Sequence, residues 1–255
     1  MQSTYLILSD TQIPDQNEEA LTLIKKFIPD LKPDFLILNG DIVNFTTVST
    51  YGYPADYKIG LDDELKICKS LLKELVRIAR EANPEVQIFY LFGNHEARLE
   101  KYLNAHGREL FDLKDELDQR VLSLEHLLGL YEMGIKHVPY SKDIRIDKAV
   151  LFHGDRARKN SGYTAHSYLQ DWGESIIVGH THRLGLVFKT HIERAKFGME
   201  TGCLCNADMK VAYTRHPDWM TGFGVLVLNH DTNTLHPTIV PIINGEFTFG
   251  GKLYN

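Results

Sequence analysis

Short apolar runs, each followed by polar or acidic residues, recur along the first two-thirds of the chain. They are rich in β-branched and aromatic residues and shorter than most helices, which predicts buried strands. The predicted strands cover residues 5–10, 35–38, 86–92, 149–152 and 175–178. After residue 184 the pattern becomes mostly strand and turn, with strands expected at 184–190, 198–205, 222–230 and 235–243.

Helical periodicity separates the strands of the first half. It is strongest over residues 61–82, where apolar positions recur every three or four residues. Asp15 and Glu18 fit a capping box at the start of the first helix. Further helices are predicted over residues 97–105, 108–131 and 162–171. The alternation predicts an α/β fold with a parallel sheet, built as one domain over residues 1–255, in which 106–132 is a helical insertion or a covering helix.

Composition narrows the class of protein. The 255 residues are 43% apolar and 24% charged, which is ordinary for a soluble globular protein. A net charge of −6 argues against non-specific nucleic-acid binding by the whole surface, but it allows a local basic groove. No apolar run reaches the roughly 20 residues of a membrane helix, and we see no signal peptide. Three cysteines are too few for a disulfide framework, so we expect a cytoplasmic protein without membrane contact.

Each of the five early strands ends near a side chain that can bind a metal ion. These side chains are Asp10, Asp41, Asn94, His153, and the pair His180 and His182. Any one of them alone is typical of a cap or a turn, but the full set after apolar runs indicates one site at the strand ends. Oxygen and imidazole ligands without thiolates favour Mn, Fe, Zn or Mg. Two such ions can hold a phosphate between them and activate a bridging water.

The residues around these positions form five short stretches. In chain order they are Asp10-Thr11-Gln12, Gly40-Asp41-Ile42-Val43-Asn44, Gly93-Asn94-His95-Glu96, His153-Gly154-Asp155 and Gly179-His180-Thr181-His182. In identity, order and spacing they resemble the five motifs of the calcineurin-like metallophosphoesterases. This resemblance implies a four-layer α/β/β/α sandwich, in which two mixed β-sheets lie face to face and are flanked by helices.

The resemblance also implies a role for each matched residue. The implied ligands of two divalent cations are Asp10 and His182 for the first, Asp41 as the bridge, and Asn94, His153 and His180 for the second. His95 would contact the phosphate and protonate the leaving oxygen, with Asn94 beside it in the catalytic pair. Gln12 departs from the family pattern, which has a histidine there, and its amide oxygen is a weaker ligand than imidazole. We therefore expect a weak first site that prefers Mn²⁺, with Fe, Zn, Mg, Ni or Co as alternatives.

The substrate class is the least determined part. The stretch Phe45-Thr46-Thr47 lacks the Asp-Arg-Gly that protein Ser/Thr phosphatases carry after the second motif, so compact bacterial or phage enzymes are the better match. We favour a phosphodiesterase that acts on nucleic acid or nucleotide diesters. A phosphomonoesterase acting on nucleotides or phosphoproteins, a non-catalytic scaffold of the same fold and a nucleic-acid-binding module are the alternatives. The oligomeric state stays open.

Other side chains are candidates for substrate contact. The arginines that follow the third and fourth motifs are Arg98, Arg156 and Arg158. They can bind phosphate oxygens bidentately, although solvated surface arginines give the same pattern. The tyrosines of the long loop over residues 45–60 that can stack on a nucleobase, or pack the loop, are Tyr51, Tyr53 and Tyr57. Cys203 and Cys205 face one side of a predicted strand, which is more typical of packing than of a metal site.

Overall fold

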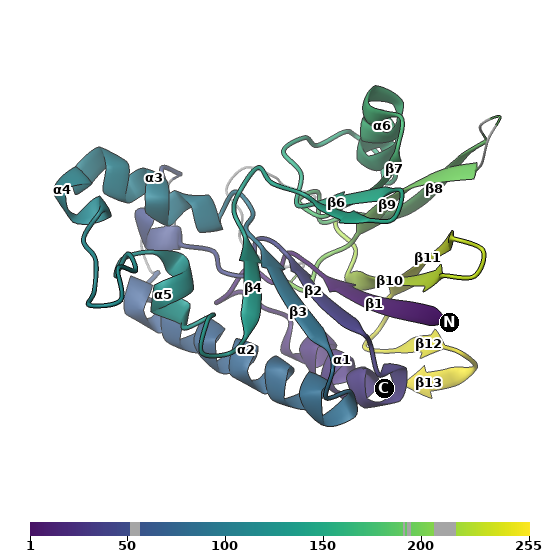
Figure 1. Ribbon diagram of the computed structural model, residues 1–255, viewed down its shortest axis with the longest axis horizontal. Coiled ribbons are helices and arrows are strands. Elements are labelled where there is room, and N and C mark those ends of the chain that lie inside the picture. Colours follow the sequence, from purple (N-terminus) through teal and green to yellow (C-terminus); the bar gives the residue numbers. More distant parts are fainter. Residues whose placement is uncertain (52–56, 191, 193–194, 207–217) are drawn as a thin grey trace.

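The computed structural model describes residues 1–51, 57–190, 192, 195–206 and 218–255. Two mixed β-sheets lie face to face, and helices cover their outer faces (Figure 1). This is the four-layer α/β/β/α architecture that the motifs imply. It follows from a chain in which short apolar strands alternate with amphipathic helices, since each element must bury one face against another layer.

The first sheet has six strands in the order β11-β10-β1-β2-β3-β4. Its strands are β1 (Gln2–Leu8), β2 (Phe35–Asn39), β3 (Gln87–Leu91), β4 (Ile135–Val138), β10 (Gly222–Asn229) and β11 (Thr234–Pro241). Strands β1 to β4 run parallel, whereas β10 and β11 are antiparallel to their neighbours. The register aligns Leu8 with Leu38 and Asn39 with Leu91, so the residues that follow these strands emerge at one edge.

The second sheet has five strands in the order β5-β6-β7-β9-β8. Its strands are β5 (Ile144–Ile146), β6 (Ala149–Phe152), β7 (Ser175–Val178), β8 (Leu184–Thr190) and β9 (Ala195–Thr201). Parallel pairing aligns Phe152 with Val178, so the fourth and fifth motifs also start side by side. A separate hairpin of β12 (Phe247–Phe249) and β13 (Lys252–Tyr254) packs on Phe27 through Phe247 and Tyr254.

The layers follow from alternation along the strands. In β1, Leu6 and Leu8 belong to the core beneath the helices, whereas Tyr5 and Ile7 belong to the core between the sheets. The helices are α1 (Glu18–Leu31), α2 (Leu61–Ala82), α3 (Glu96–His106), α4 (Arg108–Phe111), α5 (Leu124–Leu128) and α6 (Tyr163–Trp172), with a 3₁₀ turn at Thr46–Val48. Helices α1 and α2 cover the first sheet and α6 covers the second (Figure 1).

The continuous helix expected over residues 108–131 is wrong. That segment contains α4 and α5, which are four and five residues long, joined by turns. The carboxylate of Asp115 accepts hydrogen bonds from the backbone N–H groups of Leu117 and Gln119, which is a turn-forming alternative to helix. Leu117, which lies at helical spacing from Leu113 and Val121, is 77% exposed.

Smaller differences lie at the ends of elements. The N-cap of α1 is Asn17 rather than Asp15, because the Asn17 side chain accepts the backbone N–H of Ala20 at 2.9 Å. The helix also continues past Pro29 to Leu31. Strands β4, β5, β12 and β13 were not expected, because runs of three or four residues are too short to show a period. Among the described residues, none of the helices combines the length and apolarity that crossing a bilayer requires.

Candidate metal centre

The five motifs occupy loops at one edge of the two sheets. The loops of the first, second and fifth motifs leave their strands in an unusual backbone conformation, with positive φ at non-glycine residues. These residues are Asp10 (53°), Gln12 (55°), Asp41 (51°), His180 (67°) and His182 (57°). Such a conformation costs about 1–3 kcal/mol per residue and persists where surrounding structure enforces it. Because all five are candidate ligands or lie beside one, the strain is concentrated at this site.

Two glycines allow the loops to approach one another. Gly40 has a φ of 81°, and a Cβ there would collide with the His153 ring. A Cβ on Gly93 would collide with the carboxylate of Asp41. The glycines of the second and third motifs are therefore required by the close approach of His153 and Asp41, as well as by the turn itself.

Glu96 connects the second and third motifs through hydrogen bonds to their backbones. Its carboxylate accepts the backbone N–H groups of Asp41 at 2.9 Å, Ile42 at 2.8 Å and Gly93 at 2.7 Å. The Tyr90 hydroxyl donates to it at 2.7 Å, and the residue is buried. Burial and the nearby charge of Asp41 raise the pKa of Glu96, while these hydrogen bonds oppose the shift. Glu96 is part of the third motif, but nothing in the motif itself predicts this structural role.

Asp41 lies at the centre of the ligand set. Its Oδ2 is 3.1 Å from His153 Nε2 and 3.6 Å from His95 Nε2, and its Oδ1 accepts the backbone N–H of His95 at 2.9 Å. Burial disfavours the ionised form of Asp41, but the positive charge of His153 outweighs it and holds the carboxyl pKa well below its ordinary value. A carboxylate that is ionised in a buried position is suited to bridge cations.

The side chains implied as ligands of the second cation, Asn94, His153 and His180, form the second half of the site and have atoms placed to bind a cation. His153 Nδ1 is 2.7 Å from the carbonyl oxygen of Asn39, so Nδ1 carries the proton of the neutral ring and Nε2 faces Asp41. Asp41, His153 and His180 each offer a ligand atom within 4.8 Å of the others. Asn94 Oδ1 and His180 Nδ1 are buried and have no hydrogen-bond partner among the described residues. Buried polar atoms of this kind are rare unless a ligand satisfies them, so these residues fit a divalent cation.

The first half of the site consists of the side chains implied as ligands of the first cation, Asp10 and His182, together with Gln12. Asp10 Oδ1 is 3.2 Å from His182 Nε2, and Asp10 Oδ2 accepts the backbone N–H of His180 at 2.9 Å. The Gln12 amide nitrogen lies 3.5 Å from Asp41 Oδ2 and 3.4 Å from His182 Nε2. Rotating this amide by half a turn would present its oxygen to the same space. Gln12 therefore lies among the candidate ligand side chains, next to Asp41 and His182.

His95 is held by Arg98 at the mouth of the site. Arg98 Nη2 is 2.8 Å from His95 Nε2, and Arg98 Nη1 donates to the carbonyl oxygen of Asn44 at 2.7 Å. Burial and the Arg98 charge, opposed by Asp41, lower the pKa of His95 to about 3. His95 is therefore neutral in the free protein at pH 7.

The other predicted arginines lie in the loop after the fourth motif. Arg156 forms an ion pair with Asp171 and stacks over the Tyr168 ring. The Arg158 side chain is near Ser167 Oγ, at 3.5 Å. The structure thus brings Arg98 next to His95, whereas Arg156 is engaged by α6.

The tyrosines of the long loop lie in different environments. Tyr51 is 71% exposed, with the Arg98 guanidinium 5.9 Å from its ring centre. The Tyr57 hydroxyl donates to Glu64 at 2.7 Å. Tyr53 falls outside the described residues.

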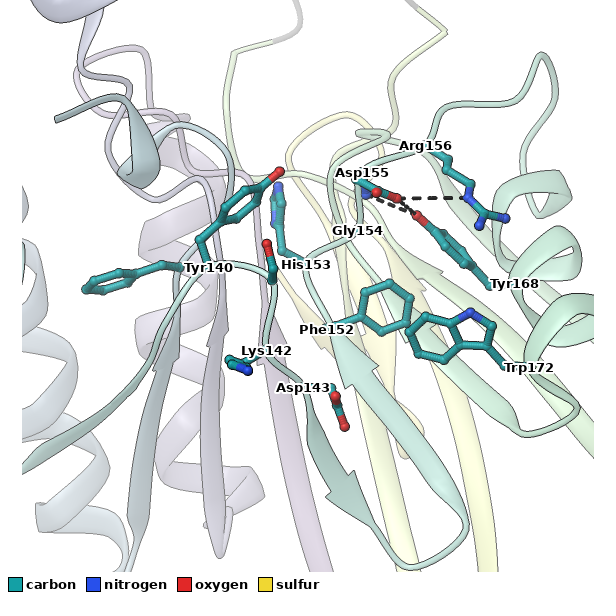
Figure 2. Close-up of a pocket in the computed structure, with 12 residues that line it drawn as sticks. Tyr140, Lys142, Asp143, Phe152, His153, Gly154, Asp155, Arg156, Tyr168 and Trp172 are labelled. Carbon is teal, nitrogen blue, oxygen red and sulfur yellow. Dashed lines mark hydrogen bonds and ion pairs between the residues drawn. The ribbon is translucent and has the colours of Figure 1, made fainter. Parts of the chain in front are cut away.

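A cavity of about 170 Å³ opens beside His153 (Figure 2). Tyr140 and Phe92 line it on the side of the first sheet, and Phe152 and Trp172 line it on the side of the second. The rings of Phe152 and Trp172 are stacked with centroids 4.6 Å apart. Burial raises the pKa of Tyr140, and the charges of Asp155 and Asp41 raise it further. The Tyr140 hydroxyl is therefore close enough to Asp41 to interact with it electrostatically. The sequence did not predict this cavity, because only one of its walls is a motif, His153-Gly154-Asp155, and the aromatic walls come from other segments.

The chain is similar to known proteins over most or all of its length. The family model described as calcineurin-like phosphoesterase matches residues 3–184, which contain all five motifs. The Gene 54 proteins of Mycobacterium phages D29 and L5 are 28% and 27% identical to this chain, and each alignment covers 100% of this chain and 99% of the phage protein. These names state no activity.

Among solved structures, vacuolar protein sorting 29 from Cryptosporidium parvum is similar. The TM-score is 0.50 at 12% identity, and the match covers 97% of this chain and 95% of that one. At this level of identity the similarity concerns the fold alone.

Proposed function

Because the chain belongs to the calcineurin-like phosphoesterase family, we propose that it is a hydrolase that cleaves phosphate esters with two divalent cations. The observation that carries this proposal is the convergence of all five motifs at one sheet edge, with buried ligand atoms that lack partners. Asn94 Oδ1 and His180 Nδ1 are the clearest of these among the described residues. A scaffold that needed no ion would leave such atoms unsatisfied at a cost of about 1–3 kcal/mol each.

The residues divide into two ligand sets that share Asp41. Asp10, His182 and Gln12 would hold the first ion, and Asn94, His153 and His180 the second. Bound there, the ions would neutralise the phosphate charge and lower the pKa of a water that attacks phosphorus. We favour Mn²⁺, because the set combines carboxylate, amide and imidazole ligands and Gln12 is an oxygen donor.

His95 would serve as the general acid. It is neutral in the free protein because its pKa is lowered to about 3, mainly by burial. The negative charge of a phosphate ester beside the ring would raise that pKa, so His95 would gain its proton as substrate binds and give it to the leaving oxygen. Arg98, 2.8 Å from His95 Nε2, would contact the same phosphate once that bond opens.

A diester is the favoured substrate, in particular a nucleotide diester or nucleic acid. The aromatic cavity beside His153 can accommodate the second ester group of a diester, since Tyr140, Phe152 and Trp172 present ring surfaces next to the metal centre. Arg156 also lines this cavity (Figure 2). A monoester has no second group to fill this space, so a phosphomonoesterase is the second choice.

The test is hydrolysis of bis-p-nitrophenyl phosphate beside p-nitrophenyl phosphate, with chelator-stripped protein and added Mn²⁺. Mn²⁺-dependent cleavage of the diester with the higher kcat/KM supports the proposal. Cleavage confined to the monoester would instead favour the phosphomonoesterase. Failure on both substrates and on oligonucleotides, with two bound ions confirmed by metal analysis, would favour the scaffold, for which Gln12 is the one supporting observation.

The state of the cysteines bears on the cellular compartment. Cys68, Cys203 and Cys205 are all free and buried. This fits a reducing compartment, and we propose the cytoplasm.

A further inference from the structure

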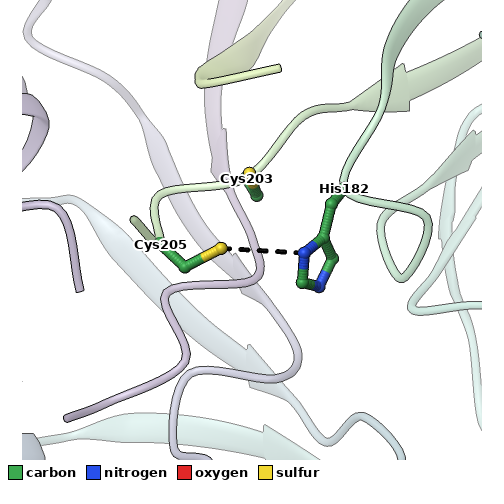
Figure 3. A group of neighbouring side chains, drawn as sticks. All are labelled: His182, Cys203 and Cys205. Atoms are coloured by element: carbon green, nitrogen blue, oxygen red, sulfur yellow. Dashed lines mark hydrogen bonds between the residues drawn. The ribbon is translucent and has the colours of Figure 1, made fainter. Parts of the chain in front are cut away.

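A second cluster of metal-binding side chains lies behind the first half of the centre. His182, Cys203 and Cys205 each offer a ligand atom within 4.8 Å of the others (Figure 3). All three are buried, with exposed fractions of 6%, 1% and 0%. Cys205 Sγ is 3.6 Å from His182 Nδ1, the ring nitrogen that faces away from Asp10. The imidazole of His182 thus has the carboxylate of Asp10 on one side and two thiols on the other.

The backbone around the two cysteines is fixed. The N–H of Leu204 contacts the carbonyl oxygens of Ser9 at 3.2 Å and Asp10 at 3.1 Å. The N–H of Cys203 donates to the carbonyl oxygen of Met220 at 3.1 Å. This oxygen also lies 3.7 Å from Cys203 Sγ. The thiols are therefore preorganised, with a carbonyl oxygen nearby as a fourth polar atom.

The donor chemistry of this cluster differs from that of the family site. Two thiols and an imidazole select Zn²⁺, Cd²⁺ or Cu⁺, whereas carboxylate and amide oxygens suit Mn²⁺ and Mg²⁺. We propose that His182, Cys203 and Cys205 form a separate site for a thiophilic cation, and that this site competes with the phosphoesterase centre for His182. Packing alone, which the Cys-x-Cys pattern first suggested, explains burial but not the convergence of two sulfurs and one ring nitrogen within 4.8 Å.

The competition follows from the single lone pair of a neutral imidazole. When Nδ1 binds the thiophilic cation, the ring proton sits on Nε2 and is donated to Asp10 Oδ1, 3.2 Å away. His182 is then lost to the first ion of the phosphoesterase centre. A divalent cation that binds both sulfurs as thiolates releases two thiol protons to solvent, and no electron is transferred.

The test is a Cd²⁺ titration of the reduced, metal-stripped full-length protein, followed by ultraviolet absorption. The wild type should develop the sulfur-to-cadmium charge-transfer band, which oxygen and nitrogen ligands do not produce. Cys203→Ser and Cys205→Ser should each weaken the band strongly, and the double variant should lose it. Cys68→Ala is the matched control, because it removes a thiol in the core of α2 and should leave the band unchanged.

The outcomes are distinguishable. Cadmium bound without a sulfur band in the wild type would overturn the site, as would a band that survives in the double variant. If the double variant fails to fold, the wild-type and Cys68→Ala spectra decide the question without it.

The competition between the two sites is measured by loading the protein with Mn²⁺ first. Cd²⁺ should then displace one Mn²⁺ per chain in the wild type but not in Cys205→Ser. Sulfur-bound cadmium with no loss of Mn²⁺ would refute the proposal that both sites use His182. None of these readouts depends on hydrolysis.

Discussion

The two halves of the metal centre are built from the same kind of loop, but they are held differently. In the second half, His153 is oriented by a backbone carbonyl, that of Asn39, and Asn94 and His180 keep unpaired ligand atoms. In the first half, His182 is oriented by the side chain of Cys205, and Gln12 contacts both His182 and Asp41. A backbone carbonyl oxygen is fixed in place and is a poor ligand for thiophilic cations, whereas a thiol can rotate and bind them. The second half is thus committed to one task and the first half is adjustable.

Removing the shared ligand should erase the difference between the halves. In Asp41→Asn, both ions should bind poorly and hydrolysis should fall to the level seen without added metal, because Asp41 contributes the charge at the centre of both ligand sets. Metal analysis and diester hydrolysis give the two readouts. Asp30→Asn is the control, since Asp30 pairs with Lys252 on the surface. Full activity in Asp41→Asn would refute the two-ion centre.

Removing His95 should separate binding from chemistry. His95→Ala should keep both ions and lose about 10²–10⁴ in kcat, the usual contribution of a general acid. His106→Ala, a change at an exposed histidine of α3, should have no effect. A His95→Ala protein that loses an ion as well would mean that His95 acts as a ligand. Unchanged kcat would remove it from the reaction.

Changing Gln12 should act on the first half alone. Gln12→His should raise the Mn²⁺ affinity of the weaker site by about tenfold, because imidazole is a stronger ligand than an amide oxygen. Gln12→Ala should lower it, and His153→Ala should instead empty the second site. Calorimetric titration with Mn²⁺ resolves the two sites. Equal, tight occupancy of both sites in the wild type and in Gln12→His would contradict the distinction drawn above.

The smallest expected effect is on stability. Burial lowers the pKa of His153, but the charge of Asp41 outweighs it and raises the pKa to about 10. The charged ring therefore stabilises the metal-free fold fully below its unfolded pKa of about 6.5, and this stabilisation is lost as the pH rises toward 10. The Tm of stripped protein should fall over this range, by about 2–4 °C per kcal/mol.

With excess Mn²⁺ the trend should reverse, because the ion replaces the proton and binds better as the pH rises. His153→Gln should show neither trend. A stripped wild-type protein whose Tm is constant between these pH values would show that Asp41 and His153 are not coupled as their 3.1 Å separation indicates.

The sequence by itself determined the elements that carry the chemistry. The apolar runs that end near Asp10, Asp41, Asn94, His153 and His180 are strands, because alternation and β-branched content are local properties of the chain. The segment over residues 108–131 shows the limit of this reasoning. Its leucine spacing is helical, yet the Asp115 carboxylate closes a turn that a period cannot reveal.

Tertiary structure alone decided how side chains from distant loops meet. Glu96 binds the backbone of a motif 55 residues earlier, Tyr140 and Trp172 share a cavity across two sheets, and Cys205 faces a histidine 23 residues before it. These encounters depend on strand register and on which edge each loop leaves, since a one-residue slip turns every side chain to the opposite face. The chain therefore specified which groups can bind metal, while packing specified which of them share His182.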